Sequence, residues 1–118
     1  MSLLFLFASP SLFAQAFLNG NFENTPVVGD QINMTNAAFN VSMANTYAFG
    51  TYGDMDNITS AAWGPPQSGS WYVALTGAGT GMITKQLNAP LVAGTSYTIT
   101  FWDRGFSGFF VYPVQLGL

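Results

Sequence analysis

The sequence predicts an all-β fold, an antiparallel jelly-roll β-sandwich, and three observations lead to this prediction. Apolar and polar residues alternate in short segments between residues 69 and 102, a pattern typical of strands with one buried face. Turns that contain Gly, Asn or Pro separate these segments, as in antiparallel sheets. Only 6% of the 118 residues are charged, whereas 49% are hydrophobic and 16% are aromatic, which is enough to build a core.

The N-terminal residues fit a secretory signal peptide. Leu3–Phe13 is an apolar run that falls well short of the ~20 residues needed to span a bilayer. Ala14-Gln15-Ala16 then places small residues at both positions that a signal peptidase reads. We therefore expect a signal peptide over residues 1–16 and a secreted chain, not inserted in the membrane, that starts at Phe17. The alternative is a buried first strand, which Ser9-Pro10 disfavours; the lack of Lys or Arg before the run departs from the usual signal pattern.

Residues 17–118 are expected to form one domain, and its first half is rich in loops. Asn21–Glu23 is interpreted as a short edge strand, and residues 32–52 as one or two irregular strands with long loops. The alternative there is a helix, which the lack of capping residues and of charge pairs four residues apart disfavours. Residues 53–70 are rich in Gly and Pro and are predicted to form a long loop, of a length that is usual for functional loops.

Three strands are predicted between residues 69 and 102. Trp71, Val73 and Leu75 share one face of the first, and Tyr97, Ile99 and Phe101 share one face of the last. We assign Trp71, Tyr97 and Phe101 to the core.

The chain ends inside a strand-like run that begins at Phe109. The pattern gives about six or seven strands, whereas a closed jelly roll has eight. We therefore expect that the domain is truncated and lacks its C-terminal strands. Such a chain would aggregate or be completed by a partner chain, because an unpaired apolar edge strand promotes association. The alternative is a small sandwich whose last strand is the C-terminus.

Charge and composition exclude several classes of function. The net charge is −3, and Lys85 and Arg104 are the two basic residues. Two cations cannot form the basic stripe that neutralises phosphates, so neither nucleic acid nor an anionic membrane surface is an expected partner. The sequence has no Cys and no His, which excludes thiol and imidazole chemistry, the usual zinc sites and a Ser-His-Asp triad.

Four segments, in order along the chain, carry a resemblance to a known family. They are Asn19–Glu23 (NGNFE), Gly69–Leu75 (GSWYVAL), Gln86-Leu87 and Pro90–Trp102 (PLVAGTSYTITFW). This succession resembles the galactose-binding-like jelly-roll modules, related to carbohydrate-binding modules, of secreted bacterial surface proteins. The resemblance covers residues 17–118, and the segment that begins at Pro90 is its most specific part.

The resemblance implies a sandwich of eight or more strands, export, and a non-catalytic role in glycan binding. It also implies a structural calcium near the start of the fold, with Glu23 as one ligand and an acid on the final strand as another. The chain ends before that second acid. Calcium takes six to eight oxygen ligands, so the alternative for Glu23 is a solvated carboxylate on an edge strand.

Asp54-Met55-Asp56-Asn57 places two carboxylates and an amide inside the predicted long loop. In an extended segment the two acids would share a face about 6.5–7 Å apart, which overlaps the spacing of glycosidase acid pairs. The same residues could contribute to a calcium loop, although the rest of an EF-hand pattern is missing. Because one flexible loop cannot hold two acids across a sugar ring, we interpret them as solvated loop acids and do not predict an enzyme.

The expected ligand site combines aromatic and amide side chains: Trp63, Asn57, Gln67, Tyr72 and Trp102. An exposed indole in a loop stiffened by prolines suits stacking against the C–H face of a sugar, and the amides would set its orientation. The alternatives are an indole that closes one end of the sandwich, and packing on the second sheet face for Tyr72 and Trp102. Asp103-Arg104 is interpreted as an exposed loop charge pair.

These observations predict a secreted, non-catalytic carbohydrate-binding module of a larger bacterial surface protein. Its partners would be carbohydrate or other domains of the parent protein. The alternative function is a structural or adhesive spacer domain without a small ligand.

Overall fold

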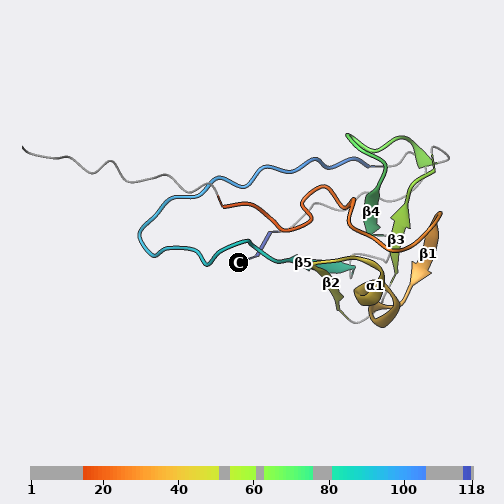
Figure 1. The fold of residues 1–118 in the computed structure, drawn as a ribbon, viewed down its shortest axis with the longest axis horizontal. Coiled ribbons are helices and arrows are strands. Elements are labelled where there is room, and N and C mark those ends of the chain that lie inside the picture. The colour runs from red at the N-terminus through yellow and green to blue at the C-terminus, as the bar shows by residue number, and fades with distance from the viewer. Residues whose placement is uncertain (1–14, 51–53, 61–62, 76–80, 106–115, 118) are drawn as a thin grey trace, which may run out of the picture.

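The computed structural model describes residues 15–50, 54–60, 63–75, 81–105 and 116–117, which form two antiparallel sheets and one helix (Figure 1). In chain order the elements are β1 (Gln31–Met34), α1 (Asn36–Ser42), β2 (Thr46–Phe49), β3 (Met55–Ile58), β4 (Tyr72–Leu75) and β5 (Met82–Lys85). The prediction of an all-β fold is thus confirmed at the level of fold class. Residues 1–14 of the predicted signal peptide and most of the strand predicted from Phe109 lie outside the described residues.

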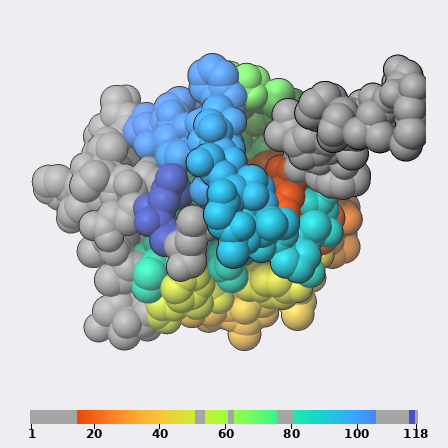
Figure 2. Space-filling model, turned by 90° about the vertical axis from the view of Figure 1, so that its left-hand side faces the viewer, coloured from red at the N-terminus to blue at the C-terminus, as the bar shows by residue number. Residues whose placement is uncertain are grey.

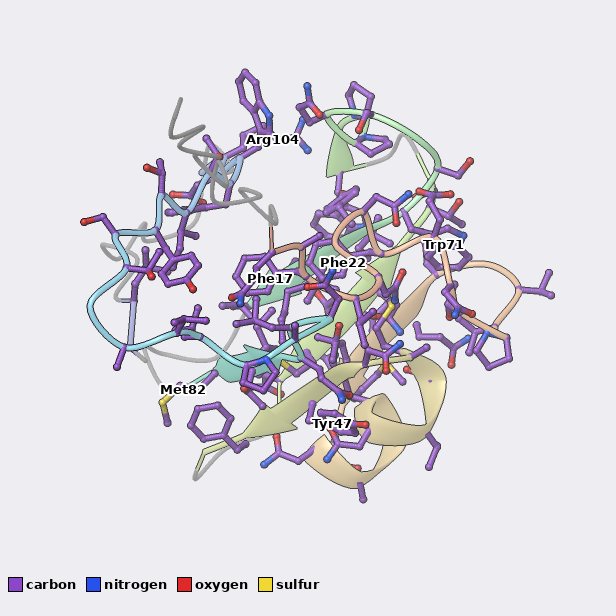
Figure 3. All side chains as sticks on the ribbon, turned by 60° about the vertical axis from the view of Figure 1, so that its left-hand side comes forward. Phe17, Phe22, Tyr47, Trp71, Met82 and Arg104 are labelled. Carbon is purple, nitrogen blue, oxygen red and sulfur yellow. The ribbon has the colours of Figure 1, made fainter. Side chains whose placement is uncertain are left out.

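The two sheets contribute to a common core. One has the strand order β1-β3-β4 and the other pairs β2 with β5. Buried side chains of β1, α1, β2 and β3 form one cluster with a residue that follows the helix, and residues of β4 and β5 pack against it. The cluster consists of Met34, Phe39, Met43, Ala48 and Met55, with Phe22, Val73 and Ile83 packed against it. Figure 3 shows Phe22 near the centre of the molecule, whereas Tyr47 and Met82 lie at its outside.

The core differs from the one predicted from alternation alone. Trp71 is only half-buried. Tyr97 and Phe101 are 37% and 51% exposed, so their assignment to the core was wrong. Methionines occupy much of the core instead, since their unbranched side chains fill irregular spaces between short elements.

Helix α1 forms where the sequence favoured irregular strands over a helix, and it has an N-cap. The Thr35 hydroxyl accepts a hydrogen bond from the N–H of Ala38 at 3.2 Å, which satisfies one of the free donors of the first turn. The helix buries Phe39 and Ser42 against the sheets. It has seven residues, and no helix in the described part of the chain is long and apolar enough to cross a membrane.

Two segments before β4 also differ from the prediction. Strand β3 lies inside residues 53–70, which were predicted to be a loop, and all four of its residues are buried. It is the central strand of its sheet, so its polar residues are surrounded by protein. Residues 18–22 form a turn in which Asn19 and Phe22 have φ angles of 51° and 63°, and the predicted edge strand at Asn21–Glu23 is absent.

Residues 88–105 follow β5 in the chain and are hereafter called the arm. Nearly all of them are exposed, and the strand predicted over Ser96–Trp102 is not formed. Figure 2 shows the arm, coloured cyan to blue, across the centre of one face, with the N-terminal segment beside it. Alternation predicted the residues that could form a strand, but a strand also needs a hydrogen-bonded neighbour.

Candidate functional site

Arg104 joins the end of the arm to the loop that contains Trp63. Its guanidinium donates hydrogen bonds to the backbone carbonyl of Pro65 at 2.9 Å and to that of Trp63 at 3.1 Å. Gly64 lies between these two carbonyls with a φ of +92°, and a Cβ there would meet the Arg104 Nη1 atom at 2.8 Å. Arg104 therefore fixes the loop to the arm, a role that the interpretation as a loop charge pair missed.

The same arginine also contacts Tyr72, another of the predicted site residues. The Arg104 Cζ atom lies 5.7 Å from the centroid of the Tyr72 ring, at the start of β4. Trp102 is two residues before Arg104, so their Cα atoms are at most about 7 Å apart. Its side chain is 80% exposed, and Trp63 and Gln67 are also exposed. Arg104 thus contacts the loop through the backbone carbonyls of Trp63 and Pro65 and contacts β4 through the ring of Tyr72.

The hydrogen bonds between Arg104 and this loop could have been expected from the prolines of the loop. Pro65 and Pro66 lack an N–H, so this segment has more carbonyl acceptors than donors. The five donors of an arginine side chain suit such a segment.

Tyr72 is the least accessible aromatic of the group. It is half-buried, and its hydroxyl oxygen is buried. Burial raises the pKa of the Tyr72 hydroxyl, while the nearby charge of Arg104 lowers it by a smaller amount. Tyr72 is therefore less accessible than Trp63 and Trp102, which are 38% and 80% exposed.

Asn57 is not part of this site, which corrects the prediction. It is fully buried in β3, where its Nδ2 atom donates a hydrogen bond to the Ser42 hydroxyl at 2.7 Å. This bond ties the central strand to α1. A ligand could reach the Asn57 amide only if the core opened.

Asp56, one of the acids of the predicted loop, is held inside the fold. Asp56 is buried in β3, so its interpretation as a solvated loop acid was wrong. Its carboxylate accepts a hydrogen bond from the N–H of Asn33 at 2.7 Å, where the register of β1 and β3 shifts and Asn33 has a φ of 54°. Burial raises the pKa of Asp56, although this hydrogen bond opposes the shift.

Asp30 likewise accepts backbone hydrogen bonds, at the other end of the pair formed by β1 and β3. The Ser60 hydroxyl and the N–H groups of Thr59 and Ser60 surround its carboxylate and lower its pKa below the usual value. The two N–H donors lie 2.7 and 2.9 Å from Asp30 Oδ1. Asp30 therefore fixes the chain as it leaves β3.

Glu23, the predicted calcium ligand, accepts two backbone hydrogen bonds. Its Oε1 atom receives the N–H of Ser70 at 2.8 Å and that of Trp71 at 2.9 Å. In the described part of the chain, no group of three or more His, Cys, Asp or Glu side chains comes together at a metal-binding distance. Calcium binding at Glu23 stays a prediction, beside a structural role that needs no metal.

Lys85 is the second cation, and its surroundings are unusual. Its ammonium donates to the Asn19 carbonyl at 2.8 Å and to the Thr46 hydroxyl at 3.1 Å. It also lies 3.8 Å from the centroid of the Phe22 ring. Burial lowers the pKa of Lys85 to about 8. Its hydrogen bonds are directed into the fold, at the turn that precedes Glu23.

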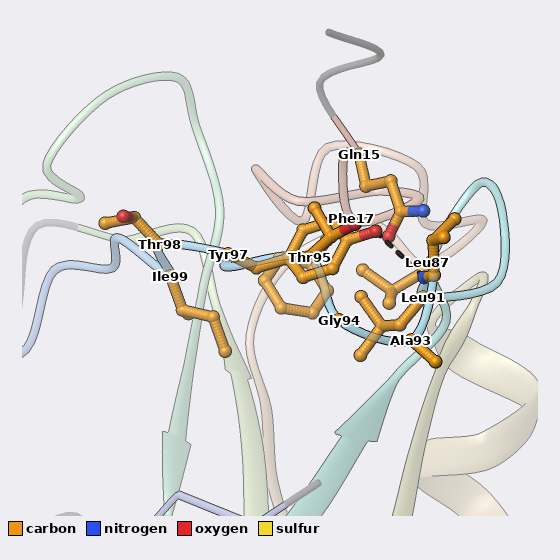
Figure 4. Close-up of a pocket in the computed structure, with 11 residues that line it drawn as sticks. Gln15, Phe17, Leu87, Leu91, Ala93, Gly94, Thr95, Tyr97, Thr98 and Ile99 are labelled. Atoms are coloured by element: carbon orange, nitrogen blue, oxygen red, sulfur yellow. Dashed lines mark hydrogen bonds between the residues drawn. The ribbon is translucent and has the colours of Figure 1, made fainter. Parts of the chain in front are cut away.

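A pocket of about 480 Å³ lies apart from Arg104, between residues Gln15 and Phe17 and the first half of the arm (Figure 4). Its wall is mostly apolar and includes Phe17, Leu87, Leu91 and Ile99. Gln15 contributes to the wall and donates a hydrogen bond to the Pro90 carbonyl. None of the predicted ligand residues lines this pocket, and its apolar wall does not suit a sugar.

Comparison with protein-family models, with curated proteins and with solved structures finds no match to this chain. The resemblance to galactose-binding-like modules therefore stays a prediction.

Proposed function

We propose that the chain is a secreted, non-catalytic carbohydrate-binding module of a larger bacterial surface protein. The observation that carries this proposal is the pair of hydrogen bonds from Arg104 to the carbonyls of Trp63 and Pro65. They fix the backbone at the exposed Trp63 to the arm, in which the exposed Trp102 is two residues before Arg104, and the Arg104 Cζ atom also lies 5.7 Å from the centroid of the Tyr72 ring. Aromatic side chains held in place around polar groups are what sugar binding requires.

The carboxylates support binding in preference to catalysis. The carboxylates of Glu23, Asp30 and Asp56 each accept hydrogen bonds from backbone N–H groups of other segments. A glycosidase needs two carboxyl groups that face the same bond of the sugar. Carboxylates that are already engaged in these hydrogen bonds are poorly placed to act as a catalytic pair.

Titration of the 118-residue chain with oligosaccharides, followed by tryptophan fluorescence and calorimetry, tests the proposal. Trp63→Ala and Trp102→Ala are each expected to weaken binding about tenfold or more, because each removes a stacking surface. Tyr47→Ala is the matched control, since Tyr47 is also exposed but lies away from Arg104 (Figure 3). The proposed site is wrong if Tyr47→Ala weakens binding as much as the tryptophan substitutions do.

The second candidate is a structural or adhesive spacer domain. The arm and the outer face of β2 and β5 favour it, because both expose large apolar side chains. This function predicts no fluorescence change with any oligosaccharide.

A further inference from the structure

The apolar pocket beside the arm is a second concave site, which the proposed glycan site at Arg104 does not use. Its volume of about 480 Å³ lies within the range of about 300–1,000 Å³ that is usual for small-molecule sites. Its wall brings Phe17 together with Leu91 and Ile99 of the arm (Figure 4). The pocket therefore has the size of a ligand site and a wall that comes from distant parts of the chain.

Hydrogen bonds fix the shape of this wall. The Tyr97 hydroxyl accepts the N–H of Val92 at 2.9 Å, and the Val92 carbonyl accepts the N–H of Thr95 at 3.2 Å. The start of the arm is joined to the N-terminal segment, because the Asn88 N–H donates to the Ala16 carbonyl at 2.9 Å. The pocket is thus formed before a ligand enters, which lowers the cost of binding.

The charge of the wall decides the class of ligand. None of the residues that line the pocket is Asp, Glu, Lys or Arg. Lys85 and Arg104, the two cations of the sequence, are bound to backbone carbonyls outside this wall. An anionic head group in the pocket would therefore lose its water without gaining a counter-ion, which is unfavourable. The wall suits a neutral ligand.

The lining and the volume suit an alkyl chain with one polar end. A chain of about eight carbon atoms would fill about half of the volume, at the ~30 Å³ that a group of the size of a water molecule occupies. Leu91 and Tyr97 are 43% and 37% exposed, so the chain would remove apolar surface from water. The Gln15 amide and the Thr95 hydroxyl can hydrogen-bond to a hydroxyl head group. Gln15 belongs to the predicted signal peptide, whereas Thr95 stays in the chain after cleavage.

We propose that this pocket binds a neutral amphiphile with a single alkyl chain and a hydroxyl head group, at a site separate from the glycan site. The uncharged apolar wall of fixed shape carries this proposal.

Displacement of the neutral fluorescent probe N-phenylnaphthylamine from the full chain tests the proposal. The competitors are octanol and octanoate, which have the same chain length, at neutral pH, where octanoate is ionised. Octanol should displace the probe at a concentration at least about tenfold lower than octanoate, because only octanoate brings an unpaired charge. Equal displacement by the two competitors would overturn the proposal. A probe that does not bind, or that is released as the protein concentration rises because a second copy fills the pocket, would also overturn it.

Charged substitutions locate the binding site within the arm. Ile99→Asp places a charge on the wall and should weaken octanol binding about tenfold or more. Thr100→Asp is the matched control, since it places the same charge on the next residue, which does not line the pocket. Equal effects of these two substitutions would contradict the proposed site.

Leu91→Lys tests the same wall at a more exposed position, where the fold tolerates a charge more easily. The added ammonium should weaken octanol binding and strengthen octanoate binding, so that the preference for octanol falls at least about tenfold. An unchanged preference would contradict the role of the uncharged wall. Circular dichroism checks that each variant is folded.

Discussion

The Lys85 ammonium is half-buried, and this makes the stability of the fold depend on pH. Its pKa is about 8 in the folded chain, against 10.5 for a free lysine side chain. Between pH 8 and 10 the unfolded chain binds more protons, so the free energy of unfolding should rise with pH. We expect an increase of about 1 kcal/mol, because solvent screens a partly exposed group.

Urea unfolding at several pH values between 7 and 10 measures this slope. Lys85→Met should abolish most of it, since methionine keeps the apolar stem and has no proton to lose. The raised pKa of Tyr72 acts only above pH 10, where stability falls as the pH rises through its shifted value. An equal slope in wild type and Lys85→Met would contradict the role of Lys85.

For single residues, the sequence predicted which side chains have the chemistry to bind a ligand better than it predicted which of them are exposed. Trp63, Gln67 and Trp102 are exposed, as a ligand site requires. Asn57 has the same chemistry as an exposed amide, but a neighbouring strand on each side buries it. The pattern of a single segment carries no information on such neighbours, so burial of a polar residue in a central strand could not be read from it.

Among the elements, helix α1 depends on a cap that the sequence analysis did not recognise. Thr35→Ala removes the hydroxyl that accepts the Ala38 N–H and is expected to lower the free energy of unfolding by about 1 kcal/mol. Thr35→Ser keeps an acceptor at the same place and should cost much less. Urea unfolding of the three proteins gives the comparison, and equal losses for Ala and Ser would show that the hydroxyl does not cap the helix.

Alternation predicted some strands well and others poorly, for physical reasons. The strand predicted at Trp71 matches β4, because one of its faces packs on the core. Strand β3 was missed because both of its faces are buried, so Met55–Ile58 shows no alternation. The segment Ser96–Trp102 alternates, but no neighbour in the described residues pairs with it. Strand formation is thus decided by partners that the local pattern does not contain.

At the scale of the whole molecule, a few long-range polar contacts join segments that are far apart in the chain. Glu23 binds the N–H groups of Ser70 and Trp71, and Asn19 binds the Ala44 carbonyl at 2.9 Å. Short strands alone would leave the N-terminal turn weakly attached. These contacts were not predictable, because the Asn19–Glu23 motif indicates a turn but not the strand that the turn meets.

The contact between Glu23 and Gly69 predicts energetic coupling across this distance. Gly69 has a φ of +71°, and a Cβ there would collide with the Glu23 carboxylate. Gly69→Ala should therefore destabilise the wild type strongly, but by about 1 kcal/mol less when Glu23 is alanine.

Gly94→Ala is the control, since Gly94 has a φ of +78° and nothing within 4 Å of its Cβ position. Its cost of about 1 kcal/mol, from backbone strain alone, should be equal in both backgrounds. Unfolding free energies of the double-mutant cycle measure this. Equal costs of Gly69→Ala with and without Glu23 would mean that the carboxylate does not hold the turn against β4.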